Sequence, residues 1–252
     1  MTPIFLYGTL RHPPLLGAMA EAAGAVAADI AAIPAQLPDH VVRHAGQEVY
    51  PQIFAEPGAQ AQGILVQADA DLCAVLDFYE GAYGYALRPV TVVTADGARS
   101  AQVYWPPETI APGPIWDLAA WVHEWGALTV SSAPDILRLR RAWAATDTRA
   151  IRPFAQARGW ARQLAQTGAP ATVRHSPAPG DVQATPREDG YDGFFGLRRL
   201  DLRYRRFSGD LSDPISREAF MAFDAALVLP YDPDRDSVLL VEQLRYGPIV
   251  RT

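Results

Sequence analysis

The sequence predicts an α+β protein of two units, and three observations carry this prediction. In the first hundred residues, β-rich runs and one helical pattern mix without a strand-helix-strand rhythm, which favours a curved or barrel-like sheet. Residues 168–189 are rich in Pro and Gly and poor in large apolar side chains, so they should be an extended linker. After them, apolar and charged residues alternate, as in a half-buried strand. We therefore expect units at 1–110 and 190–252 and a helical extension at 111–167.

The elements of the first unit are expected in the following order. Residues 4–10, IFLYGTL, are typical of a buried strand that breaks sharply at its glycine, and residues 61–67 predict a second strand. Residues 69–81, DADLCAVLDFYEG, start with Asp and end with Gly, which predicts a short amphipathic helix. Two β-rich runs over 88–105 flank Asp96-Gly97, and this pair predicts a hairpin with a type I′ turn.

The helical extension and the second unit follow. Residues 115–166 are expected to be helical throughout, and seven arginines between 138 and 162 indicate a solvated helical face, with a partner-binding stripe as the alternative. In the second unit, Leu200, Leu202 and Tyr204 alternate with charged residues, and DPDRD at 232–236 predicts another hairpin. This unit of about 60 residues is near the lower limit for independent stability, so we expect it to be the front of a domain that continues past the chain shown.

Composition excludes several classes of partner. Of the 252 residues, 49% are hydrophobic, and the formal charge of −6 gives no electrostatic reason to bind nucleic acid or an anionic membrane. No apolar run approaches the roughly 20 residues of a bilayer span. Cys73 is the only cysteine, and the N-terminus lacks the basic and apolar regions of a secretory signal. We expect a cytoplasmic protein with small-molecule substrates.

Two features of the first unit suggest a site. The turn Tyr7-Gly8-Thr9-Leu10 should leave backbone N–H groups unpaired and pointing at one place, a possible anion cradle. Glu80 ends the predicted helix among Phe78, Tyr83 and Tyr85, surroundings that would raise its pKa and suit it to acid/base chemistry. An ordinary surface glutamate at a helix terminus is the alternative.

Together these residues resemble the gamma-glutamylcyclotransferase-like, or AIG2-like, family. The resemblance rests on YGTL, LDFYEG, YGYALRPVTV and VYWP in this order, and it covers about residues 3–107. Many members have Tyr-x-Arg after the glutamate, whereas this chain has Tyr85-Ala86-Leu87-Arg88, one residue longer. The resemblance implies a mixed barrel that releases 5-oxoproline from a γ-glutamyl amine without a cofactor. It assigns Glu80 as the acid/base, Tyr7, Gly8, Thr9 and Leu10 as the cradle for the γ-glutamyl group, and Tyr104 as a residue lining the pocket.

The second unit resembles the N-terminal part of ADP-ribose pyrophosphatases of the Nudix superfamily, including those labelled tellurite-resistance proteins. The resemblance rests on four short sequence motifs of this unit: GFF, SREAF, LPYDP and VEQLR. It implies a partial Nudix α/β/α domain with a mostly antiparallel sheet, a homodimer, and Mg²⁺ for hydrolysis of ADP-ribose to AMP and ribose 5-phosphate. The Nudix box does not occur in the 252 residues, so the magnesium carboxylates are expected beyond Thr252. The resemblance assigns Phe194 to stack on adenine, and Arg217, Glu218 and Arg245 to contact the bound ADP-ribose.

Three hypotheses remain open at this point. The chain could belong to a two-domain enzyme with both activities, its first unit could be a non-catalytic binding module, or both units could be interaction scaffolds. For Arg217 and Glu218, the alternative to contact with ADP-ribose is an ordinary exposed ion pair between the two side chains. Glu80 is necessary for cyclisation, but its presence does not prove that reaction.

Overall fold

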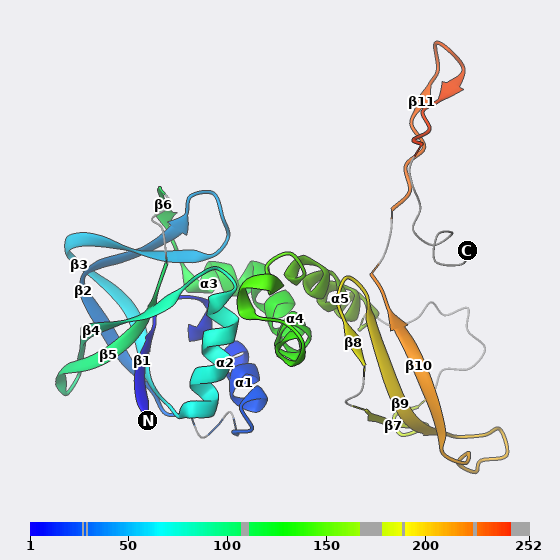
Figure 1. Ribbon diagram of the computed structural model, residues 1–252, viewed down its shortest axis with the longest axis horizontal. Helices are drawn as coiled ribbons and strands as arrows, with labels where there is room; N and C mark the ends of the chain where they lie inside the picture. The colour runs from blue at the N-terminus through cyan, green and yellow to red at the C-terminus, as the bar shows by residue number, and fades with distance from the viewer. Residues whose placement is uncertain are drawn as a thin grey trace.

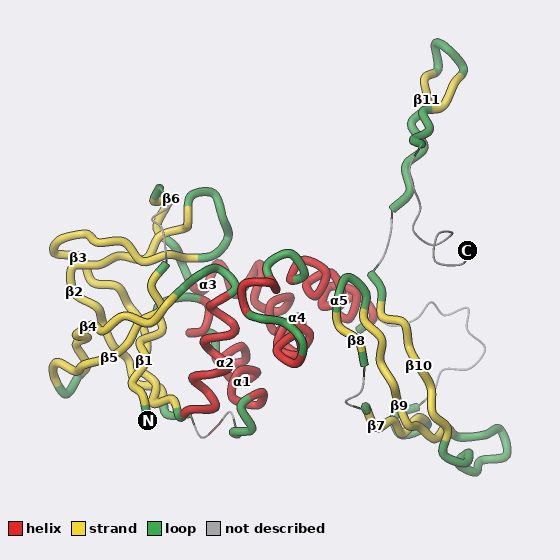
Figure 2. Tube along the Cα trace, in the orientation of Figure 1, coloured by secondary structure: helices red, strands yellow, loops and turns green. Residues whose placement is uncertain are grey.

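The computed structural model describes residues 1–26, 28, 30–106, 111–166, 178–187, 190–223 and 226–242. Figure 1 shows a strand-built body at the N-terminal end, a group of helices beside it, and a second, smaller sheet beyond the helices. Figure 2 shows the same arrangement by secondary structure, with the helices gathered between two groups of strands.

The first unit is a closed barrel with mixed strand directions. Its six-stranded sheet has the order β3-β1-β5-β4-β2-β6, and an additional pairing of β3 with β2 closes the first five of these strands into a barrel. The pairing of β1 with β5 is parallel, and the other described pairings in this sheet are antiparallel. The expected α+β barrel is therefore confirmed. The strands are β1 (Thr2–Leu6), β2 (Ala32–Ala45), β3 (Pro51–Ala68), β4 (Ala86–Thr94), β5 (Gly97–Trp105) and β6 (Pro112–Ile115).

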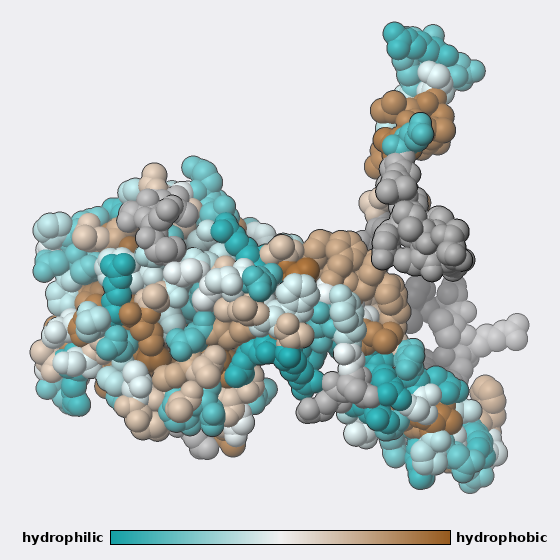
Figure 3. All heavy atoms as spheres, viewed as in Figure 1, coloured by the Kyte–Doolittle hydropathy of each residue, from teal (hydrophilic) through white to brown (hydrophobic). Residues whose placement is uncertain are grey.

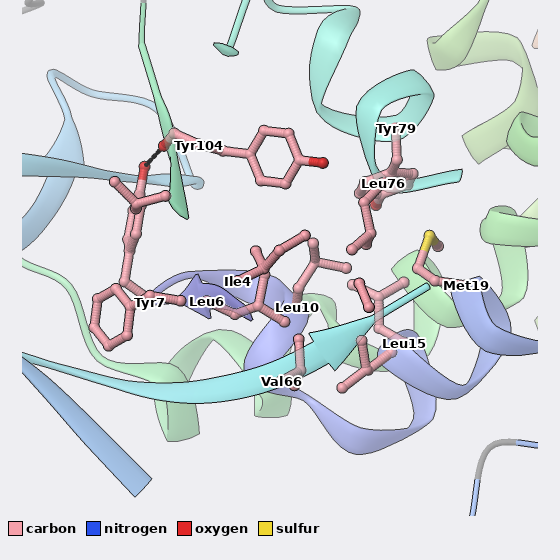
Figure 4. Packing of buried hydrophobic residues seen from close by; sticks show 14 of the residues in the cluster. Ile4, Leu6, Tyr7, Leu10, Leu15, Met19, Val66, Leu76, Tyr79 and Tyr104 are labelled. Carbon is pink, nitrogen blue, oxygen red and sulfur yellow. Dashed lines mark hydrogen bonds between the residues drawn. The ribbon is translucent and has the colours of Figure 1, made fainter. Parts of the chain in front are cut away.

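Helices α1 (Pro13–Ala22) and α2 (Ala70–Gly81) contribute to the barrel's hydrophobic core. The predicted helix over 69–81 is confirmed, and the Asp69 side chain caps it by accepting a hydrogen bond of 2.8 Å from the Leu72 amide. Figure 4 shows side chains from β1, α1 and α2 meeting in this core. Among the fully buried members are Ile4, Phe5, Leu15, Met19, Val66, Leu76 and Val103.

The hairpin of β4 and β5 is confirmed, but its predicted turn type is wrong. Thr94 pairs with Gly97, so Ala95 and Asp96 form the two-residue turn. A type I′ turn needs positive φ at both central residues, whereas here Gly97 alone has it, at 109°. Because a Cβ atom disfavours the left-handed region, the chain places that conformation on the glycine after the turn.

The helical extension is less regular than predicted. It contains α3 (Leu118–Trp121), a π-helical segment at Val122–Gly126, α4 (Ala127–Arg138) and α5 (Arg152–Ala165). Strand β6 occupies Pro112–Ile115, and between α4 and α5 the chain forms 3₁₀ turns at Leu139–Arg141 and Ala145–Thr148. Helix α4 packs against α1, α2 and α5, so the extension is part of the first unit's body.

Only part of the solvated arginine face interpreted from the sequence is present: Arg140, Arg141 and Arg149 are exposed, but the other four arginines between 138 and 162 are buried or half-buried. Arg152 is 4% exposed and Arg158 is 1% exposed. Asp135, itself 1% exposed, explains part of this burial, because its carboxylate lies among four guanidinium groups and neutralises part of their charge. We call this group the Asp135 cluster; it comprises Asp135, Arg138, Arg158, Arg162 and Arg198.

The second unit is an open sheet with the order β10-β9-β7, and β8 pairs with β9. The predicted alternating strand is confirmed as β9. Strand β7 lies within the segment expected to be linker; it pairs with β9 from Val182↔Tyr204 to Pro186↔Leu200. The predicted hairpin around 232–236 pairs only two residues on each side. The strands are β7 (Val182–Pro186), β8 (Tyr191–Asp192), β9 (Gly196–Tyr204), β10 (Ile215–Met221), β11 (Tyr231–Asp232) and β12 (Ser237–Val238).

The hairpin of β11 and β12 exposes much apolar surface. Leu227 is 97% exposed, Val228 81% and Leu240 73%. Figure 3 shows this apolar surface in brown on the segment that projects away from the rest of the molecule. Within the described ranges, no helix combines the length and apolar character needed to cross a bilayer.

Candidate functional site

A pocket of about 160 Å³ lies where the end of β1, the end of α2 and the helical extension meet. Its lining includes all six residues that the sequence placed in a first-unit site. The extension contributes a further wall from α3, α4 and α5, which sequence reasoning did not anticipate. The six expected residues are Tyr7, Gly8, Thr9, Leu10, Glu80 and Tyr104, and the extension adds Trp121, Thr129, Ser132, Ile136, Arg152 and Gln156.

The turn after β1 supplies backbone N–H groups to this pocket. Its short 3₁₀ turn begins at Thr9, and the Arg11 amide donates a hydrogen bond of 3.0 Å to the Gly8 carbonyl oxygen. Among the described residues, the amides of Gly8, Thr9 and Leu10 have no acceptor. A Cβ atom at position 8 would lie 2.9 Å from Pro51 Cγ, so a larger residue there would force the turn or the proline ring to shift. Unpaired amides in such a turn can bind an anion.

Glu80 ends α2 and lines the same pocket. Burial disfavours its charged form and raises the pKa of the carboxyl group to about 7, although the positive charge of Arg152 acts in the opposite direction. In the part of the chain that the structure describes, the Glu80 carboxylate has no hydrogen-bond or ion-pair partner. A partly buried carboxylate with a pKa near neutrality can both accept and deliver a proton.

Tyrosine side chains form the rest of the wall around Glu80. The Tyr7 hydroxyl donates a hydrogen bond of 3.2 Å to the Tyr104 carbonyl oxygen, and the Tyr104 hydroxyl donates one of 2.7 Å to Asp77 on α2. Figure 4 shows the first bond as a dashed line and the Tyr104 ring directed toward α2. Burial raises the pKa of Tyr79 to about 12 and also raises the pKa of Tyr85. These phenols are therefore neutral at physiological pH.

Arg152 is the functional candidate that sequence reasoning missed. Its guanidinium carbon lies 4.9 Å from the centroid of the Tyr79 ring and 5.2 Å from that of Tyr83. Arg88, the arginine of the aromatic stretch that follows the glutamate, is instead exposed and lies over Trp105 at 5.6 Å. No motif marks Arg152; the one local signal is its place before Pro153 at the start of a helix.

The residues that the sequence assigned to ADP-ribose binding in the second unit do not meet at one place, unlike those of the first-unit pocket. The Phe194 ring is 44% exposed and packs 4.1 Å from the centroid of Phe154 on α5. Arg217 and Glu218 are successive residues of β10, so their side chains point to opposite faces of the sheet. Glu218 pairs with Arg199 at 3.5 Å, and a ligand on one face of this sheet would contact only one of the two. Arg245 lies outside the described residues.

The described residues offer no metal site. No group of three or more His, Cys, Asp or Glu side chains that could hold a metal ion occurs among them. The acidic residues in the described part of the second unit therefore do not form a site that fits Mg²⁺.

Comparison with known proteins supports the resemblance of the first unit. Residues 4–123 match the family model described as gamma-glutamyl cyclotransferase, AIG2-like. Among solved structures, a protein from Arabidopsis thaliana is 18% identical and covers 56% of this chain and 93% of its own, with a TM-score of 0.40. An AIG2-like protein from Mus musculus is 20% identical; the match covers 46% of this chain and 88% of the mouse chain, with a TM-score of 0.37. Over residues 4–123, the chain is therefore similar to the AIG2-like family.

The chain also matches curated proteins named ADP-ribose pyrophosphatase. The protein of Escherichia coli K12 is 46% identical over 65 residues, which are 26% of this chain and 31% of the relative. The protein of Haemophilus influenzae is 33% identical over 88 residues, 35% of this chain and 37% of the relative. The chain thus spans about a third of the length of these relatives.

Proposed function

We propose that the first unit is a γ-glutamylcyclotransferase that releases 5-oxoproline from a γ-glutamyl amine. The observation that carries this proposal is the placement of the partnerless Glu80 carboxylate in the same pocket as the free amides of Gly8, Thr9 and Leu10. The match of residues 4–123 to the gamma-glutamyl cyclotransferase family supports the same reaction.

The reaction needs no nucleophile from the protein. The α-amine of the substrate attacks its own γ-carbonyl carbon and forms the new C–N bond of the ring. The bond from that carbon to the leaving nitrogen then breaks, so 5-oxoproline and a free amine result. The protein must hold the substrate bent, accept a proton from the α-ammonium group and deliver a proton to the leaving amine.

Glu80 is assigned to both proton transfers. With a pKa of about 7, its carboxylate accepts the ammonium proton and passes it to solvent. It then accepts the second proton, which the attacking nitrogen loses once the new C–N bond has formed, and delivers that proton to the leaving nitrogen as its bond to carbon breaks. The free amides of Gly8, Thr9 and Leu10 bind the substrate's α-carboxylate and hold the bent conformation. The neutral rings of Tyr79 and Tyr104 line the site. The proton transfers need no cofactor.

The test is direct turnover by the full chain. It is incubated with γ-glutamylethylamide, and 5-oxoproline and ethylamine are measured by mass spectrometry. Equal amounts of the two products are expected. Binding of the compound without release of either product would instead favour a non-catalytic binding module.

As a second candidate function, we propose that the second unit binds ADP-ribose. The 46% identity over 65 residues to proteins named ADP-ribose pyrophosphatase favours it, and the Phe194 ring is exposed enough to stack on a base. In a complete protein with metal-binding carboxylates beyond residue 252, this unit would belong to a Nudix enzyme that uses Mg²⁺. Calorimetry with ADP-ribose tests the binding, and Phe194→Ala should weaken it by roughly 1 to 3 kcal/mol. Unchanged affinity in that variant would contradict the assignment.

We also propose that the complete protein is a homodimer. The open sheet of the second unit and the exposed apolar residues Leu227, Val228 and Leu240 need a covering surface. Sedimentation of the full-length protein should give twice the monomer mass, and a monomer across the micromolar range would contradict the proposal.

A further inference from the structure

The second unit contacts the helical extension through the edge formed by β8 and the start of β9. At this edge the Arg198 side chain is 19% exposed, and its Nη2 donates hydrogen bonds of 3.0 Å to Asp135 on α4 and 2.5 Å to Asp192 on β8. Trp143 Nε1, from the turn after α4, donates one of 3.2 Å to the Asp192 carbonyl oxygen. Arg198 therefore joins a carboxylate of the extension to a carboxylate of its own sheet.

Helix α5 is held by the same edge. Arg158, which is 1% exposed, donates hydrogen bonds of 3.3 and 3.0 Å from Nη1 to the carbonyl oxygens of Gly193 and Phe194. The Phe194 ring lies 4.1 Å from the centroid of Phe154. Phe154 and Arg158 lie one turn apart on α5, so the second unit fixes this helix at two successive turns.

The two helices that this edge holds form a wall of the first-unit pocket. Helix α4 contributes Ser132 and Ile136, and α5 contributes Arg152 and Gln156. The helices pack closely, because a Cβ atom on Gly159 would lie 2.3 Å from Ser132 Oγ. A displacement of α5 would therefore change the wall of the pocket.

Glu80 responds to the position of this wall through Arg152. The Arg152 guanidinium donates a hydrogen bond to the Tyr79 carbonyl oxygen and favours the charged form of Glu80. The other titratable groups that interact with Glu80 are phenols, which are neutral at physiological pH: Tyr7, Tyr79, Tyr85 and Tyr104. Because an electrostatic interaction weakens with distance, moving α5 away would weaken the effect of Arg152.

We propose that the second unit is a functional part of the first-unit site, in which Arg198 is a positioning residue that holds α4 and α5 so that Arg152 stays beside Glu80. This role rests on the proposed cyclotransferase function and does not depend on whether the second unit binds ADP-ribose. Arg198 does not line the pocket and acts through Asp135 and the packed helices.

The experiment measures kcat/KM against pH for the full chain with γ-glutamylethylamide. Arg198→Met keeps a long side chain and leaves Asp135 paired with Arg138 and Arg162. Its apparent pKa should rise by about 0.5 to 1 pH unit, and kcat/KM at pH 7 should fall about 2- to 5-fold. The rise should be absent when Arg198→Met is added to Arg152→Met, because the charge that Arg198 positions is already gone.

Two further variants complete the test. Trp143→Phe keeps an aromatic ring but removes the N–H that binds Asp192, so it should raise the apparent pKa in the same direction, and it replaces Arg198→Met if that variant does not fold. Arg203→Met is the matched control, because Arg203 is an exposed arginine of the same strand on the opposite face of the sheet. It should leave the profile unchanged.

Three results would contradict this role of the second unit. A lower kcat with an unchanged apparent pKa in Arg198→Met would overturn it, because loss of folded protein reduces only the amount of active enzyme. A rise that persists in the Arg152→Met background would also overturn it, because the lost charge of Arg198 would then act directly on Glu80. Both of these results leave the proposed function intact, whereas no 5-oxoproline from the wild type would overturn the proposed function and this role with it.

Discussion

The Arg152 guanidinium donates a hydrogen bond to the carbonyl oxygen of Tyr79, the residue immediately before Glu80. This bond joins α5 of the helical extension to the last turn of α2, where the candidate acid/base lies. The same guanidinium lowers the pKa of Glu80, which burial raises. One arginine therefore affects both the position and the titration of this carboxyl group.

The rate of cyclisation should follow the titration of Glu80. Because the carboxylate is the base and its pKa is about 7, kcat/KM should rise between pH 6 and 8 with an apparent pKa near 7. A pH series of initial rates with γ-glutamylethylamide measures this. An apparent pKa near 4.5, that of an ordinary glutamate, would contradict the assignment.

Arg152→Met should move this profile toward higher pH. The variant removes the positive charge that stabilises the Glu80 carboxylate, so the apparent pKa should rise. Arg140→Met removes an exposed arginine and should leave the profile unchanged. A shift to lower pH in Arg152→Met would contradict the described electrostatics.

Glu80→Gln should stabilise the folded protein at neutral and higher pH. Because the folded-state pKa is raised from 4.5 to about 7, the folded state binds the proton more tightly than the unfolded state. The wild type therefore loses stability as the pH rises through this window, whereas the variant does not. The difference in the free energy of unfolding should grow to about 1 to 3 kcal/mol by pH 8.

Urea unfolding at pH 4.5 and pH 8 measures that difference. Glu21→Gln, at an exposed position of α1, is the control and should show no comparable gain. A variant at position 80 that is less stable than the wild type at pH 8 would show that the carboxylate is favourably solvated.

Gly8→Ala should disturb the amide turn through Pro51. The new Cβ would lie 2.9 Å from Pro51 Cγ, so the turn must shift, and we expect a loss of stability of about 1 to 3 kcal/mol together with a raised KM. Chemical denaturation and steady-state kinetics measure the two effects. The double variant Gly8→Ala, Pro51→Ala should recover most of both, and no recovery would place the cause elsewhere.

Asp135→Asn should strongly destabilise the protein. The variant leaves the buried guanidinium of Arg158 and its neighbours without their shared negative charge, and breaking a buried pair in this way costs about 3 to 5 kcal/mol. Asp213→Asn is the control, because Asp213 pairs with Arg206 at 94% side-chain exposure and should change stability by less than about 1 kcal/mol. Similar unfolding midpoints for the two variants would contradict the structural role of the Asp135 cluster.

Local signals in the sequence are sufficient for part of this structure. The turn at Tyr7 to Leu10, the capped helix ending at Gly81 and the hairpin at Gly97 each depend on neighbouring residues, so they could be predicted. The strand β2 could not, because Pro34 and Pro38 argue against a strand; the structure accommodates them with an irregular register next to Asp39, whose φ is 57°. Helix α1 was missed because it starts with two prolines, which a first helical turn tolerates.

The residues missed at the site depend on long-range contacts. Arg152 is distant in sequence from the carbonyl of Tyr79 that it contacts, and only the packing of α5 against the first unit brings them together. The arginines around Asp135 look like a solvated face in sequence, since nothing local shows that one aspartate is buried among them. Burial of a charged side chain follows from the tertiary fold, so a single sequence does not show it.

The role of Glu80 as the acid/base is tested by comparing the release of 5-oxoproline by the full chain and by its Glu80→Gln variant. Both are incubated with γ-glutamylethylamide at pH 8, and 5-oxoproline is measured over time, with circular dichroism to show that both are folded. This role predicts release by the wild type and a loss of at least about 100-fold in the variant, because glutamine cannot accept the proton. Equal rates in the two proteins, or no 5-oxoproline from the folded wild type with any γ-glutamyl amine, would contradict it.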